Sequence, residues 1–228
     1  MEEIYVLLLN QLSRYSDQDL IENEIKLNYY HYYISSLFIK SNKRSKLLCI
    51  LSLDLELNKI LKFNTEKNIL ILKFDWWRIA CTQSIEGKDF SVPLLRLFRK
   101  LFYNNYNLKD KLVYLIDLFQ KYSLEKNDKL KLKYYYQYLI LKNNIITSLL
   151  EILISDSKIN KALRLAIISK TYEKFNINKV AYFCMNKAKY LCKKPKREYL
   201  ILFLLSSSFR FEKRFIVRQL FYSILRYW

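Results

Sequence analysis

The residues best suited to do chemistry in this sequence are cations near its C-terminal end. Six lie within eleven positions and four follow, giving Lys187, Lys189, Lys193, Lys194, Lys196, Arg197, Arg210, Lys213, Arg214 and Arg218. A polyanion relieves the repulsion among such charges and releases its own counterions on binding. We therefore predict that these residues bind nucleic-acid phosphates, without reading bases. Two alternatives are a solvated lysine-rich face and cations that complement the C-terminal end of a helix.

The charge of the whole chain points the same way. Among 228 residues, 40 Lys and Arg face 21 Asp and Glu, for a formal net charge of +19. The abundance of Lys, Asn, Ile, Tyr and Phe is typical of AT-rich genomes, but that bias raises Glu together with Lys and does not explain the imbalance. The excess positive charge favours RNA, DNA or an acidic protein as partner.

Motifs for catalysis and for metal binding are missing from the sequence. It has a single histidine, His31, and no nucleophile elbow, Walker loop or HExxH motif. Asp54 and Glu56, two positions apart on a helix, do not share a face and are poor evidence for acid–base catalysis. The cysteines lack the close spacing of zinc ligands and are predicted to be buried free thiols: Cys49, Cys81, Cys184 and Cys192. We predict no enzyme activity, catalytic residue, cofactor, metal or small-molecule substrate.

The residues discussed above are predicted to lie on helices. The chain is 52% hydrophobic, which is enough for a sizeable core, and it has one Gly and two Pro, too few for the tight turns of a β-sandwich. Apolar residues three and four positions apart favour helices over strands. The expected fold is all-α, an antiparallel bundle or α-solenoid of about 10–12 helices.

In the N-terminal half, apolar periodicity predicts five helices and one ambiguous segment. The helices are expected over 2–15, 18–39, 47–61, 93–104 and 108–122, with Ser16 and Ser41 as caps. The segment 69–92 has two interpretations, a small β-hairpin or helices joined by a loop over 84–92. We favour the helical interpretation.

In the C-terminal half, Tyr134, Tyr138 and Leu141 predict one helix, and the apolar residues from Ile145 to 152 predict another. The polar 142–144 would form the turn between them. Further helices are expected over 158–175, from 176 or 178 to 191, over 196–206 and over 212–227. The helix ending at 191 is expected to pack through one stripe, formed by Val180, Phe183, Cys184, Ala188 and Leu191.

Small side chains are expected to bring the backbones of these C-terminal helices close together. The residues concerned are Ala162, Ala166, Ala181 and Ala188. Ser157 is the expected N-cap of the helix over 158–175.

Two regions are expected, an N-terminal helical region over 1–122 and a C-terminal basic helical-repeat region over 129–228, or one continuous domain. The polar 123–131 would connect them. No apolar run reaches ~18 residues, the length a membrane-spanning helix needs. The acidic start of the chain is unlike a signal peptide. We expect an intracellular protein, nuclear or cytoplasmic, alternatively mitochondrial.

Four segments in matching order resemble PCI-type helical-repeat proteins, most nearly the PCI scaffold subunit of the TREX-2 complex in messenger-RNA export. They are 51–55, 135–144, 178–192 and 196–202. The resemblance implies a non-catalytic scaffold that contacts RNA and protein subunits. It also implies a terminal winged-helix module, for which no residues follow Trp228. Either that module is lost, or the resemblance is to helical repeats in general.

A second resemblance rests on 38–46, on 86–93 and on Asn178 with Lys179. These segments are similar to the mitochondrial form of the small-subunit ribosomal protein of type seven, which is helical and basic. The expected function is a basic, non-catalytic helical scaffold in an RNA-handling complex, binding RNA phosphates and protein partners. The alternatives are that ribosomal protein and a structural subunit of a large protein assembly.

Overall fold

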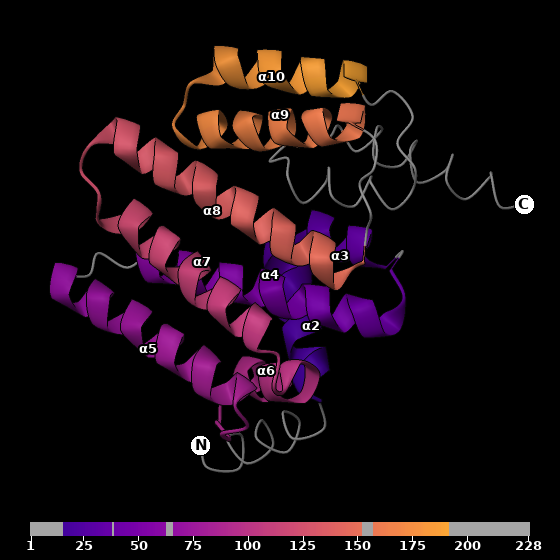
Figure 1. Ribbon diagram of the computed structural model, residues 1–228, viewed down its shortest axis with the longest axis vertical. Helices are drawn as coiled ribbons and strands as arrows, with labels where there is room; N and C mark the ends of the chain where they lie inside the picture. The colour runs from indigo at the N-terminus through magenta and orange to yellow at the C-terminus, as the bar shows by residue number, and fades with distance from the viewer. Residues whose placement is uncertain (1–15, 38, 63–65, 152–156, 192–228) are drawn as a thin grey trace, which may run out of the picture. The chain divides into compact units, whose positions relative to one another are not determined.

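The computed structural model describes residues 16–37, 39–62, 66–151 and 157–191. Every regular element in these ranges is a helix, so the predicted all-α fold is confirmed (Figure 1). The chain forms two compact units, Met1–Leu150 and Glu151–Trp228. Helices predicted over 2–15, 196–206 and 212–227 lie outside the described residues.

The described helices of the first unit form a bundle. They are α2 (Asp17–Asn28), α3 (Tyr30–Ser36), α4 (Ser41–Lys62), α5 (Lys67–Ile85), α6 (Pro93–Phe102), α7 (Tyr106–Leu124) and α8 (Asp128–Leu149). The second unit contributes α9 (Ser157–Lys174) and α10 (Asn178–Leu191). Within the described ranges, no helix combines the length and the apolar character that crossing a membrane requires.

Helix α4 is the centre of the first unit. All nine residues from Leu47 to Leu55 are buried, so this helix has no solvent-facing stripe along its middle. A helix that is buried around its whole circumference must be surrounded by others. Accordingly, α4 packs against α2, α3, α5, α6, α7 and α8 (Figure 1).

A buried polar cluster joins α4 to α8. The Lys142 ammonium lies 3.0 Å from Asp54 Oδ1, with side-chain exposures of 5% and 7%. Tyr138 also donates its hydroxyl to Oδ1, and the Tyr29 hydroxyl lies 3.3 Å from Oδ2. Burial, together with the Asp54 charge, raises the pKa of both tyrosines, which keeps their hydroxyls protonated as donors.

This cluster corrects two sequence-based predictions. The predicted turn over 142–144 does not exist, because α8 runs unbroken and buries Lys142 against Asp54. The single helix predicted over 18–39 is instead two, since the backbone breaks at Tyr29 (φ −132°, ψ 50°). That break turns the Tyr29 hydroxyl toward Asp54. The residues next to Lys142 and Tyr29 in the sequence do not indicate these contacts, because the partner Asp54 is distant in the chain.

The capping prediction at Ser16 is confirmed. Its hydroxyl accepts a hydrogen bond from the Asp19 backbone N–H, and Asp19 accepts one from the Ser16 backbone N–H. This reciprocal pair is a capping box, which satisfies donors that the first turn of α2 would otherwise leave unpaired. Ser41, expected as a cap, is instead the first residue of α4.

The β-hairpin alternative for 69–92 is wrong. Helix α5 is continuous from Lys67 to Ile85, with Phe74, Trp77 and Cys81 buried at helical spacing. The strand character of 69–72 came from a run of apolar residues whose period cannot distinguish the two structures. The predicted loop is present in shorter form, over 86–92, and Pro93 begins α6 as expected.

Among the described helices, those on either side of residues 122–129 belong to the same compact unit. Helices α7 and α8 lie on either side of that segment, are joined by only three residues, and pack against one another as an antiparallel pair (Figure 1). Short connections place consecutive helices side by side. The boundary between the two compact units lies in the chain between residues 150 and 151.

The reactivity of two buried thiols tests how tightly the core of the first unit is packed. Cys49 and Cys81 are free and at most 1% exposed, and burial raises the pKa of both, that of Cys81 to about 12. The thiolate is the reactive form, so both should be modified by maleimide at least ~100-fold more slowly in the native protein than in denaturant. Peptide mass spectrometry after timed labelling measures this. Rapid native labelling of Cys49 would contradict the packing of α4.

Candidate nucleic-acid interface

The second unit presents α9 and α10 as a helical hairpin. Four small or flexible side chains of α10 are buried: Ala181, Cys184, Met185 and Ala188. On α9, Ala162 and Ala166 are fully buried, and the Ser169 hydroxyl donates a 2.7 Å hydrogen bond to the Ala181 carbonyl. Small residues let the two backbones approach closely, which confirms the packing predicted from the four alanines.

The opposite side of α10 is solvent-facing and carries aromatics between lysines. Tyr182, Phe183 and Tyr190 are 64%, 63% and 69% exposed. Lys179 and Lys187 are exposed on the same side, because these positions follow helical spacing. We call these five residues the α10 face.

The predicted packing stripe of α10 is therefore partly wrong. Cys184 and Ala188 are buried as expected, but Val180 and Phe183 are exposed. The contact with α9 is made where alanines permit close approach, and the large apolar residues are left outside. Periodicity alone assigns the packing side of a helix by its hydrophobic content. In α10 the small residues indicate the packing side better than the large apolar ones do.

Of the ten predicted cationic site residues, the structure describes only the first two positions. Lys187 is exposed on the α10 face, and its ammonium lies 5.7 Å from the centre of the Phe183 ring. Lys189 belongs to the same helix. The others lie outside the described residues, namely Lys193, Lys194, Lys196, Arg197, Arg210, Lys213, Arg214 and Arg218.

The described part of the second unit is strongly cationic. Residues 157–191 contain eight Lys or Arg and one acid, Glu173, a formal charge of +7. Burial raises the pKa of the Cys184 thiol, and the nearby Lys187 charge opposes that rise. An unbalanced positive charge beside exposed rings is the combination found in grooves that bind single-stranded nucleic acid.

Exposed rings of this kind were not among the predicted site residues. A base stacked on Tyr182 or Tyr190 would cover apolar ring surface that water now contacts, and any base could do so because every base has a flat π-face. The signal available in the sequence was the alternation of lysine and aromatic residues from 179 to 190.

The other concentration of ionisable groups, around Asp54, is unsuited to a substrate. Its carboxylate and the Lys142 ammonium are both nearly inaccessible. We interpret it as structural. Across the described ranges, no three His, Cys, Asp or Glu side chains come together as a metal site would require.

Comparison with known proteins finds no match, whether with family models, with curated proteins or with solved structures. The resemblances to PCI-type proteins and to the ribosomal protein stay predictions.

Proposed function

We propose that the protein is a non-catalytic helical scaffold that binds single-stranded RNA through the α10 face. The observation that carries this proposal is the alternation of exposed rings and lysines on one side of α10. Lysines attract the phosphates without regard to sequence, and the rings provide stacking surfaces for unpaired bases. Double-stranded RNA would bind less well, because its bases are already stacked.

The scaffold part of the proposal is supported by helix α5. Its exposed apolar residues follow one another at intervals of three, four and three: Ile69, Leu72, Trp76 and Ile79. This is the seam spacing of helices that pack against other helices. We propose that the partner is a helix of another subunit, in an RNA-handling complex of the TREX-2 kind that the sequence resembles.

The salt dependence of RNA binding tests the phosphate contacts. We expect the whole chain to bind a uridine oligonucleotide of about 20 nucleotides with submicromolar affinity near physiological salt, because several lysines replace condensed counterions. For single strands, each phosphate contact contributes roughly −0.7 to the slope of log affinity against log salt. The Lys187→Ala variant should therefore lower the steepness by about that amount, as measured by fluorescence anisotropy.

Lys129→Ala is the matched control, since Lys129 is exposed on α8 and away from the α10 face in sequence. It should leave the slope unchanged. Feeble binding of the parent chain, or equal slopes for both variants, would contradict the proposal and favour a structural subunit whose cations pair with acidic proteins.

A further inference from the structure

Helix α6 gives the first unit a cationic face of its own. Five of its ten residues are buried, namely Leu94, Leu95, Leu97, Phe98 and Phe102. Arg96, Arg99 and Lys100 lie on the other side, three and four positions apart, and the helix contains no acid. Every carboxylate near this face must therefore come from another segment.

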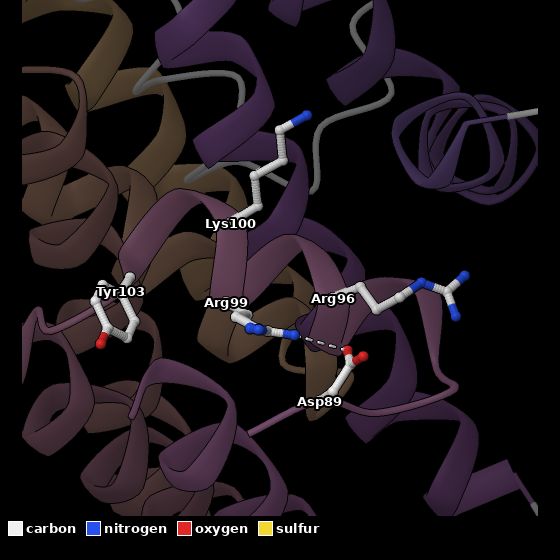
Figure 2. A pocket seen from close by; sticks show the side chains of 5 residues that line it. All are labelled: Asp89, Arg96, Arg99, Lys100 and Tyr103. Atoms are coloured by element: carbon white, nitrogen blue, oxygen red, sulfur yellow. Dashed lines mark ion pairs between the residues drawn. The ribbon is translucent and has the colours of Figure 1, made fainter. Parts of the chain in front are cut away.

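This face borders an open pocket of about 550 Å³. It is lined by Asp89, Arg96, Arg99, Lys100 and Tyr103. In Figure 2 Arg99 points toward Asp89, whereas Arg96 and Lys100 extend away from that pair. Three cations and one carboxylate make the lining positive.

The three cations differ in how firmly they are held. Arg96 donates to both carboxylate oxygens of Asp17 and, over 2.6 Å, to the Ser91 carbonyl. Arg99 makes an ion pair of 3.1 Å with Asp89, whose side chain is 71% exposed. Within the described residues Lys100 has no ion-pair partner. Arg96 is therefore held in place by its hydrogen bonds, whereas the side chains of Arg99 and Lys100 can reorient toward an incoming anion.

The single glycine of the chain supports the rim of this pocket. Gly87 has φ +103°, and a Cβ added there would stand 2.9 Å from the Tyr103 ring. The absence of a side chain lets the ring lie against the backbone. The Asn104 N–H donates a 3.0 Å hydrogen bond to the Ile85 carbonyl and ties the two loops together.

We propose that the α6 pocket binds a phosphate group, for which Arg99 exchanges its contact with Asp89. An exposed ion pair is worth little, so a dianion with several acceptor oxygens can displace the carboxylate at small cost. Arginine binds phosphate with two parallel hydrogen bonds, and Lys100 and Arg96 add charge. Asp89 then acts as an internal competitor. This inference stands apart from the RNA contact at α10.

Calorimetric titration of the whole chain with pyrophosphate tests the exchange. Asp89→Asn should tighten binding about two- to fivefold, because the competitor is removed. Arg99→Ala should weaken it about tenfold, because a charge-assisted contact is lost. Lys129→Ala is the control and should have no effect. An unchanged affinity in Asp89→Asn or in Arg99→Ala would overturn the proposal.

Two further arms identify the source of the phosphate. If Arg99→Ala weakens binding of a 5′-phosphorylated oligonucleotide but not of its 5′-hydroxyl form, the pocket takes a terminal phosphate. Equal weakening of both supports a backbone phosphate. Replacing Tyr182 and Tyr190 by alanine should leave pyrophosphate affinity unchanged, so that failure at this pocket and failure at the α10 face are told apart.

Discussion

Replacing Lys142 with methionine is expected to lower the free energy of unfolding by about 3–5 kcal/mol. The substitution keeps most of the side-chain volume but removes the ammonium from Asp54, whose carboxylate stays buried. The hydroxyl of Tyr138 still donates to that carboxylate, but it does not supply a positive charge. Urea unfolding, followed by circular dichroism at about 222 nm, where α-helices give a strong signal, measures the loss.

The control is Lys129→Met, in the first turn of the same helix, where the side chain is exposed. Its effect should stay within about 0.5 kcal/mol. The double variant Asp54→Asn with Lys142→Met removes both charges and should be less destabilised than the sum of the single variants by about 0.5–3 kcal/mol. Strict additivity, or equal losses for Lys142→Met and Lys129→Met, would contradict a buried ion pair.

Replacing Tyr182 and Tyr190 with alanine is expected to weaken single-stranded RNA binding about 30-fold or more. Each stacked base contributes roughly 1–3 kcal/mol, and every 1.4 kcal/mol is tenfold in affinity. Both side chains are more than 60% exposed and lie on the side of α10 away from Ala181 and Ala188, so their removal should leave the hairpin folded. Anisotropy of a labelled uridine oligonucleotide provides the affinity.

Tyr106→Ala with Tyr114→Ala is the matched control, because these tyrosines are 57% and 49% exposed on α7 of the other unit. That pair should change RNA affinity less than about twofold, as surface substitutions away from a contact do. A loss of similar size in both double variants would show that the rings of α10 have no special part in binding.

The fold class followed from the sequence because it depends on local patterns. Helical periodicity located the segments of α4, α6, α7 and α9, and Ser16 and Pro93 marked two helix starts. The errors arose where distant residues decide the outcome. The local sequence around Lys142 predicts a turn, whereas in the structure Lys142 lies in a helix and contacts Asp54, which is 88 positions earlier in the chain.

The candidate site was predicted in part. The excess charge pointed to the region around Lys187, and the structure places that lysine on an exposed helix face. Hydrophobicity alone predicts that Phe183 lies in the core, so it does not reveal the aromatic half of the face. Which side of α10 packs on α9 depends on how closely the alanines let two backbones approach, and that is a property of the pair of helices.

Photochemical crosslinking of the whole chain to single-stranded uridine RNA can locate the bound nucleotides on the protein. After tryptic digestion, we expect RNA adducts on the peptide over 180–187, which contains Tyr182 and Phe183, and on the peptide that begins at Ala188 or Tyr190. Adducts confined to peptides of the first unit, with none between 180 and 193, would contradict RNA binding by the α10 face.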